Sequence, residues 1–182
     1  MRFCPTAIIV IFATLLAYSS WHNAPVWHEP SQLLAGLNIW KFGRFDTQTV
    51  NPPLVRSVVS FPVLALSPNH DKKFDRPPTE RDEFHLGGLF LEENIERARL
   101  LFFVARLACL VFAVAGALFC YHFTKELFGH TSGTIALLII CFSPFLLGHG
   151  ATIMNDVPTA FWHAPEKLLF REDIRQNVIL DN

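Results

Sequence analysis

Two carboxylates in the sequence stand at the ends of apolar runs, where a side chain could act on a substrate at a membrane surface. Glu29 lies in the segment WHEP after the first apolar run, and Asp156 lies in the segment NDVP after the third. A carboxylate in such a place can act as a general base and take the proton of an acceptor hydroxyl. The alternative is that both only stabilise the N-termini of the helices that follow them. We treat both as candidate catalytic residues.

Two arginines are candidate substrate-binding residues. Arg56 lies in the segment NPPLVR, one turn into a short apolar helix. Its forked donors suit a phosphate, although the side chain could equally reach out to lipid head groups. Arg106 is the only formal charge of the second apolar run. Because a charge inside a membrane usually faces a bundle interior or a cavity, Arg106 is expected to have either a structural partner or a ligand.

No motif in the sequence predicts a metal or cofactor site. The eight His are scattered, and neither HExxH nor CxxC occurs, so a divalent metal is not supported and no cofactor is predicted. The four Cys lie in apolar stretches, which is typical of buried thiols rather than disulfides. The net charge of −1 argues against a nucleic-acid partner, and the 51% share of hydrophobic residues excludes a disordered chain.

Three apolar runs, at 5–21, 100–123 and 133–154, must position these residues. The first has no charge and about the minimum length for a bilayer-spanning helix. The second is long enough for a tilted crossing, and Pro144 is expected to kink the third. We predict an all-α membrane protein with three transmembrane helices. Two alternatives are core helices of a soluble protein and, for the first run only, a cleaved signal peptide.

The mixed segment 22–99 between the first two runs is predicted to form a long outer loop. Within it, residues 31–41 and 53–66 have the pattern of helices that are too short to span, with Trp, Lys and Arg side chains nearby at head-group depth. We expect both helices to lie in the membrane interface. The short link 124–132 forces the second and third runs into an antiparallel hairpin. The loop and the segment after the third run then share the outer face.

The order and spacing of these motifs resemble the start of the GT-C-fold membrane glycosyltransferases. The chain is most similar to family 39, the group of protein mannosyltransferases and aminoarabinose transferases, over Thr6 to Trp162. The resemblance is carried by the segments WHEPSQLLAGLNIWKFGRFD, NPPLVR, FFVARLACLVF and LFGHTSGTIALLIICFSPFLLGHGATIMNDVPTAFW.

This resemblance implies that a sugar is transferred, with inversion, from a polyprenyl-phosphate lipid donor to an acceptor hydroxyl or amine at the outer face. The first acidic motif of the family is usually Asp-Glu and supplies the base; here His28 stands at its first position and Glu29 at its second. Asp156 matches the second acidic motif, which helps to shape the active site. We expect His28, Arg56 and Arg106 to bind substrate. The expected partners are membrane lipid and the sugar donor, and the expected location is the cell (inner) membrane, as a multi-pass protein.

Members of the family are much longer and have many more spanning helices. We therefore expect residues 1–162 to be the N-terminal part of a GT-C transmembrane domain and residues 163–182 to be a divergent polar tail. The chain is then a fragment, inactive alone, that lacks the C-terminal remainder of the enzyme. The alternative function is a small non-enzymatic membrane protein that binds partners through its first loop.

Overall fold

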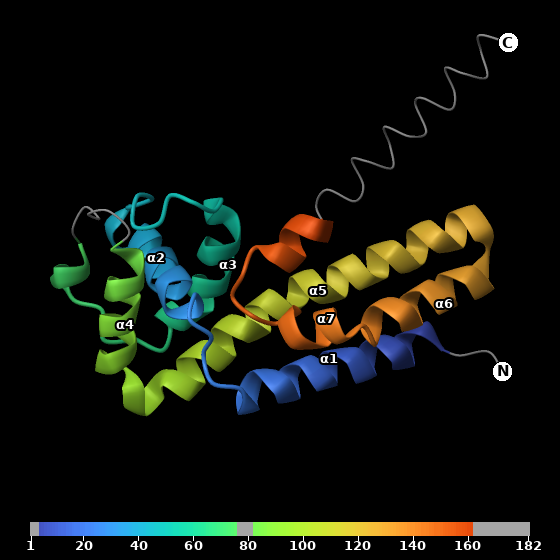
Figure 1. The fold of residues 1–182 in the computed structure, drawn as a ribbon, viewed down its shortest axis with the longest axis horizontal. Helices are drawn as coiled ribbons and strands as arrows, with labels where there is room; N and C mark the ends of the chain where they lie inside the picture. Colours follow the sequence, from blue (N-terminus) through green and yellow to red (C-terminus); the bar gives the residue numbers. More distant parts are fainter. Residues whose placement is uncertain (1–3, 76–81, 162–182) are drawn as a thin grey trace, which may run out of the picture.

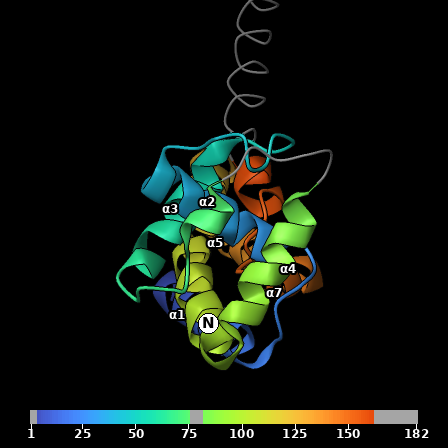
Figure 2. The same ribbon diagram turned by 90° about the vertical axis from the view of Figure 1, so that its left-hand side faces the viewer.

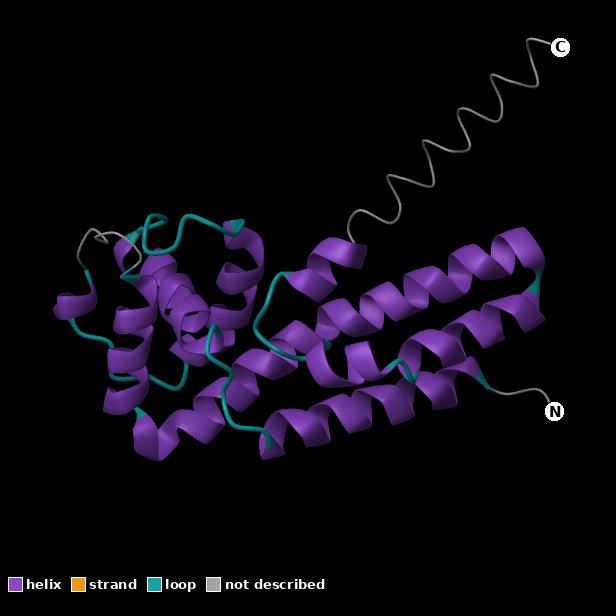
Figure 3. Cartoon of the chain, viewed as in Figure 1, coloured by secondary structure: helices purple, strands orange, loops and turns teal. Residues whose placement is uncertain are grey.

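One long helix connects two groups of helices in the computed structural model, which describes residues 4–75 and 82–161 (Figure 1). All regular structure in this described part is helical (Figure 3). The elements are α1 (Pro5–His22), α2 (Glu29–Phe42), α3 (Pro53–Leu64), η1 (Lys72–Phe74), α4 (Glu83–Glu93), η2 (Ile95–Arg97), α5 (Ala98–Phe128), α6 (His130–Cys141) and α7 (Pro144–His149). The tail expected at 163–182 lies outside the described residues.

The long helix α5 takes part in two hydrophobic cores, one in each half of its length. Its first half shares a core with α2, α3 and α4, in which the largest buried side chains include Phe74, Phe90 and Phe102. Its second half shares a core with α1, α6 and α7, in which Phe12 and Leu16 of α1 are buried. The all-α class predicted from the sequence is confirmed for the described residues.

The predicted hairpin between the second and third apolar runs is present. α5 contains 31 residues and is about 46 Å long. It ends at Gly129, whose φ of +87° is a backbone conformation that glycine adopts without strain. α6 begins at the next residue and packs back along α5. The two helices approach closely at Gly133, which has no side chain. A Cβ at this position would lie only 3.0 Å from the carbonyl oxygen of Tyr121.

Two helical segments are long and apolar enough to cross a membrane, by length and composition. They are α1, with 18 residues, and the segment Ile95–Phe128, which contains α5. The outer side of α1 carries the exposed apolar side chains of Val10, Ile11 and Leu15, and such a continuous apolar surface suits lipid better than water. The predicted runs 5–21 and 100–123 therefore coincide with the two candidate spans.

The third predicted span, 133–154, is wrong as a single helix. α6 ends at Cys141, and α7 runs only from Pro144 to His149. Proline has no N–H and disfavours helical backbone in the residue before it, and Ser143 accordingly has a ψ of 126°. Turns, not helix, follow α7 as far as Asn155. In the described residues, two helices instead of three are therefore long enough to span.

The predicted short helices in the segment 22–99 are present as α2 and α3, but most of α2 is covered by other helices. It lies between α3 and α4, as the view in Figure 2 shows, and every residue from Glu29 to Asn38 is buried. Residues 31–38 are therefore covered by protein, whereas Trp40 and Lys41 near the end of α2 are exposed, and a position at the membrane interface stays a prediction. α3 does keep an exposed apolar side, formed by Leu54, Val58 and Phe61.

Glycines at two helix contacts explain how α2 is covered from both sides. A Cβ on Gly36 would overlap the carbonyl oxygen of Arg56 in α3. A Cβ on Gly87 of α4 would lie 2.6 Å from the main-chain nitrogen of Ser31. Because neither glycine has a side chain, α3 and α4 can approach the backbone of α2 closely.

Candidate functional site

The side chains of Glu29 and Arg106 form a buried ion pair where the two groups of helices meet. Oε1 of Glu29 accepts a hydrogen bond from Nε of Arg106 at 2.9 Å, and Oε2 accepts one from Nη2 at 2.5 Å. The Glu29 side chain is 0% exposed and that of Arg106 is 3% exposed. A two-point contact of this kind fixes the orientation of both groups.

The remaining donors of Arg106 bind main-chain carbonyls at the end of α1. Nη1 donates to the carbonyl oxygens of Ser20 and Asn23, at 2.9 and 2.8 Å, and Nη2 donates to that of Ala24 at 3.0 Å. All five N–H groups of the guanidinium therefore have acceptors. Carbonyls at a helix C-terminus have no hydrogen-bond partner within the helix, so Arg106 also caps the C-terminus of α1.

The carboxylate of Glu29 accepts two further hydrogen bonds, both from main-chain N–H groups. Val26 donates to Oε2 and Ile153 donates to Oε1, each at 2.9 Å. Each oxygen thus has two donors, which occupy the usual acceptor positions of a carboxylate. Glu29 could act as a base only if one of these donors left it.

This network joins four segments of the chain: the end of α1, the start of α2, the first half of α5 and the turns after α7. Of the two expectations for Arg106, the structure provides the structural partner. Glu29 is the acidic residue in the first turn of α2, so its charge is also favourable at that helix N-terminus, although the hydrogen bonds of its carboxylate come from Arg106, Val26 and Ile153. Glu29 thus binds an arginine that lies 77 residues away in the sequence.

A small cavity of about 110 Å³ borders this network, between the end of α1 and residues 147–152. Arg106, Asn23 and Thr152 are among the residues that line it. Its volume suits a few water molecules rather than a substrate. The ion pair is therefore close to a small cavity, although its own side chains are buried.

His28 directly precedes Glu29 but lies on the outside of the protein. Its side chain is exposed, and its ring meets the ring of Phe84 edge-on, with 5.2 Å between centroids. Trp27 is 77% exposed and stacks on the same Phe84 ring, with 6.1 Å between centroids. A substrate in solution can therefore reach His28, whereas Glu29 is covered.

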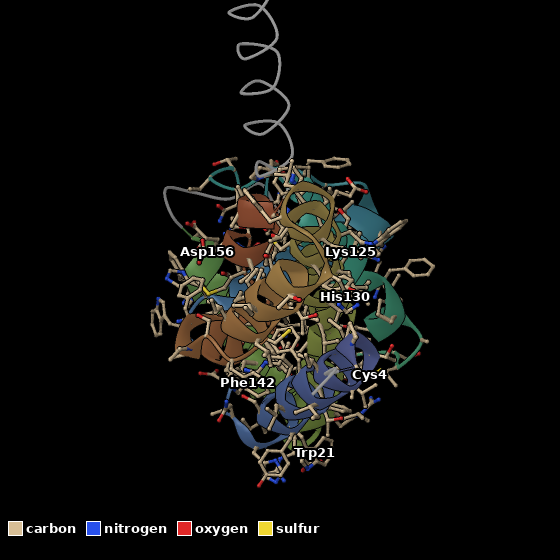
Figure 4. All side chains as sticks on the ribbon, turned by 90° about the vertical axis from the view of Figure 1, so that its right-hand side faces the viewer. Cys4, Trp21, Lys125, His130, Phe142 and Asp156 are labelled. Atoms are coloured by element: carbon tan, nitrogen blue, oxygen red, sulfur yellow. The ribbon has the colours of Figure 1, made fainter. Side chains whose placement is uncertain are left out.

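Asp156 is also exposed, at the first residue of the helical turn 156–161 (labelled in Figure 4). The structure brings the segments of the two acidic motifs together, because Ile153, three residues before Asp156, donates its N–H to Glu29. It does not bring the two carboxylates into one hydrogen-bond network within the part of the chain that the structure describes.

Arg56 lies in α3, is 3% exposed and has no carboxylate partner among the described residues. Nη1 donates to Oε1 of Gln48 at 2.9 Å, Nη2 donates to the carbonyl oxygen of Phe45 at 3.4 Å, and Nε has no acceptor. Burial lowers the pKa of its guanidinium. The alternative that Arg56 extends to lipid head groups is not found, because its charged end is covered.

Two buried polar groups of the structure are not singled out by any pattern in the sequence. Nε2 of His70 donates to Oδ1 of Asn38 at 2.6 Å, and the amide of Asn38 donates to Thr47 and to the carbonyl oxygen of Phe74. The side-chain amide of Asn155 is buried without any partner and lines a cavity.

Metal binding finds no support in residues 4–75 and 82–161, where no group of three or more His, Cys, Asp or Glu side chains could hold an ion. The fold and the site together define an all-helical protein with two candidate membrane spans and a buried Glu–Arg pair between its two helix groups. The chain matches no protein-family model, no curated protein and no solved structure.

Proposed function

We propose that the chain belongs to a membrane glycosyltransferase of the GT-C type, similar to family 39. Such an enzyme would transfer a sugar from a polyprenyl-phosphate donor to an acceptor hydroxyl or amine at the outer face of the cell membrane. The observation that supports this most directly is the hydrogen bond from the Ile153 N–H to Glu29, because it joins the segments of the two acidic motifs across 124 residues. Two segments so far apart meet at one end of the proposed spans.

The proposal places three passes of the chain in the membrane: α1, α5, and α6 together with α7. α6 and α7 contain 12 and 6 residues, which together match the 18 residues of α1, and both pack beside α1. A helix break such as that at Pro144 is tolerated in a membrane where neighbouring protein covers the freed backbone.

Aromatic and basic side chains support two membrane boundaries. At one end Arg99 lies over the ring of Trp21, 5.8 Å from its centroid. At the other end are Lys125 and His130, beside the α5–α6 turn; Figure 4 views the protein from this end and labels both. Such side chains concentrate at the depth of lipid head groups.

In the proposed reaction, the acceptor oxygen or nitrogen forms a bond to the anomeric carbon, the bond from that carbon to the phosphate oxygen breaks, and the phosphate leaves with the electron pair. The acceptor proton passes to a base. Because the acceptor positions of Glu29 are occupied, we assign Glu29 to positioning and the proton to Asp156 or His28, which are exposed. Glu29, bound to Arg106, would hold His28 at the start of α2.

The test is sugar transfer by the natural full-length protein in proteoliposomes that contain a polyprenyl-phosphate sugar. Asp156→Asn and His28→Gln are compared with Glu96→Gln, an exposed control. The variant that removes the base should transfer sugar about 10²- to 10⁴-fold more slowly, while its thermal unfolding stays unchanged. Normal transfer by both variants, or no transfer from any donor by the well-folded protein, would overturn the assignment.

A second candidate function is a non-enzymatic membrane protein that binds a partner through the segment 22–99. The observation in its favour is the exposure of large apolar side chains there, 77% for Trp27, 72% for Val50 and 59% for Phe61. A folded full-length protein that neither binds the lipid donor nor transfers sugar would favour this candidate.

A further inference from the structure

A second and larger cavity, of about 320 Å³, lies between the start of α3, the middle of α5 and the segment after α7. Leu54 and Val55 of α3 and Phe112 of α5 form apolar walls, and Pro158 and Thr159 face them. Its volume is at the lower end of the range for small-molecule sites. Leu54 is 56% exposed and also belongs to the apolar side of α3, so the cavity is continuous with an apolar surface.

The side chain of Asn155 is the unusual part of this cavity. Asn155 lines the cavity and is 8% exposed, and neither Nδ2 nor Oδ1 has a hydrogen-bond partner. At the residue before a helical turn, an Asn side chain usually accepts a hydrogen bond from the first N–H groups of that turn. Here the Asn155 side chain accepts no such bond, and its main-chain carbonyl accepts the ordinary helical hydrogen bond from the N–H of Thr159 at 2.8 Å. A buried amide needs hydrogen bonds, so Asn155 has one donor group and one acceptor to offer to a ligand.

The charges around the cavity decide what kind of polar group fits. No Lys or Arg is among the described residues that line it. An anionic head group in the cavity would therefore have no cation beside it to balance its charge. A hydroxyl suits the amide better, because it can donate to Oδ1 and accept from Nδ2 at the same time.

We propose that this cavity binds a neutral long-chain alcohol, with its hydroxyl on the Asn155 amide and its hydrocarbon chain against Leu54, Val55 and Phe112. The ligand enters from the exposed side of Leu54, which continues the apolar surface of α3. The inference does not rest on the proposed sugar transfer, because it uses only the cavity, its lining and the unpartnered amide. An alcohol of this class is distinct from the anionic lipid donor of that reaction.

The test is photo-labelling of the full chain in lipid nanodiscs with a decanol that carries a diazirine in its chain, followed by peptide mapping. Labels should concentrate on the peptides that contain Val55, Phe112 and Thr159, more than on the exposed apolar residues of α6. Unlabelled decanol should compete at least about tenfold better than decane, since only its hydroxyl can form hydrogen bonds with the Asn155 amide. Decyl phosphate should compete no better than decane.

Two variants and one control complete the test. Asn155→Leu keeps the size of the side chain and removes the amide, so it should abolish the advantage of decanol over decane. Thr159→Trp fills the cavity from an exposed position and should abolish labelling of the cavity peptides by any probe. Asn51→Leu, close in the sequence to α3 but not lining the cavity, should change neither result. Labels spread evenly over the apolar surface, stronger competition by decyl phosphate, or an unchanged preference in a folded Asn155→Leu protein would each overturn the proposal.

Discussion

Glu29 and Arg106 meet in a two-point ion pair that is buried on both sides, although 77 residues separate them in the sequence. Every N–H of the guanidinium and both carboxylate oxygens have partners, so the pair lies at the centre of a complete network. A buried ion pair is often no better than apolar residues of the same size, but removing one partner leaves an uncompensated buried charge. Loss of either side chain should therefore affect folding before it affects chemistry.

We expect Glu29→Gln to lower the free energy of unfolding by about 3–5 kcal/mol, because the Arg106 charge then stays buried without a counter-ion. The measurement is denaturant-induced unfolding of the purified protein in a mild detergent, followed by helical circular dichroism. Glu96→Gln, at an exposed position of η2, is the matched control and should change stability by no more than about 0.5 kcal/mol.

A double variant separates the pair from its surroundings. Glu29→Gln with Arg106→Gln should be less destabilised than the sum of the two single variants, because neither charge remains unpaired. Additive effects would show that the two side chains are not coupled and that the pair does not hold the four segments together.

Gly87 and Gly88 are neighbours in α4 with opposite surroundings. A Cβ on Gly87 would lie 2.6 Å from the backbone of Ser31, whereas nothing lies within 4 Å of one on Gly88. Gly87→Ala should therefore destabilise the protein by about 1–3 kcal/mol through overpacking. Gly88→Ala should stabilise it by about 0.5–1 kcal/mol, since alanine is the better helix former. Thermal unfolding of both variants checks this; equal shifts would mean that α4 does not contact α2 as described.

The stability of the α2–α4 group should fall in mild acid because of His70. Burial, with a smaller effect from the charge of Lys41, lowers the pKa of His70 to about 4 from its ordinary 6.5. His70 therefore binds a proton more tightly in the unfolded chain than in the folded one. The contribution of neutral His70 to the free energy of unfolding is complete above pH 6.5 and is lost as the pH falls towards 4. The loss should reach at most about 3 kcal/mol.

The measurement is the unfolding free energy between pH 7 and pH 4 for the natural protein and for His70→Gln. Glutamine keeps a donor for Asn38 and does not titrate, so the variant should have a flatter profile over this range. Identical profiles would place the titrating group elsewhere.

Local patterns in the sequence were sufficient for most of the helices. The apolar run at 5–21 and the longer one at 100–123 predict α1 and the core of α5, and the nine-residue link predicts the hairpin. The prediction of one kinked helix over 133–154 is wrong because composition alone does not show where a helix stops, and the helix ends before Pro144 instead of bending there. The sequence does not predict the burial of α2, because this burial depends on the close contacts of Gly36 with α3 and of Gly87 with α2, which form only in the folded protein.

The candidate site was accessible to sequence analysis only in part. Topology placed the two acidic motifs at the same end of the proposed spans, and the Ile153–Glu29 hydrogen bond is consistent with this. The sequence does not predict the pairing of Glu29 with Arg106. A charged residue in an apolar run is expected to have a partner, but the sequence does not show which residue that partner is. The cavity at Asn155 has no signature at all in the sequence, since three distant segments form it.

The proposed membrane topology puts the segment 22–99 outside and the α5–α6 turn inside. It is tested with single cysteines at Ser67, between α3 and η1, and at Thr131, in the first turn of α6; both positions are exposed. The four natural cysteines are first replaced by Ala. In intact cells a membrane-impermeant maleimide should label Ser67→Cys but not Thr131→Cys, since a charged reagent cannot cross the apolar bilayer. After permeabilisation both should react, which shows that the thiol of Thr131→Cys is accessible. Labelling of Thr131→Cys in intact cells would show that α5 crosses in the opposite direction or does not cross. Equal labelling of both residues in a fraction free of membranes would show that α1 and α5 are the core of a soluble protein.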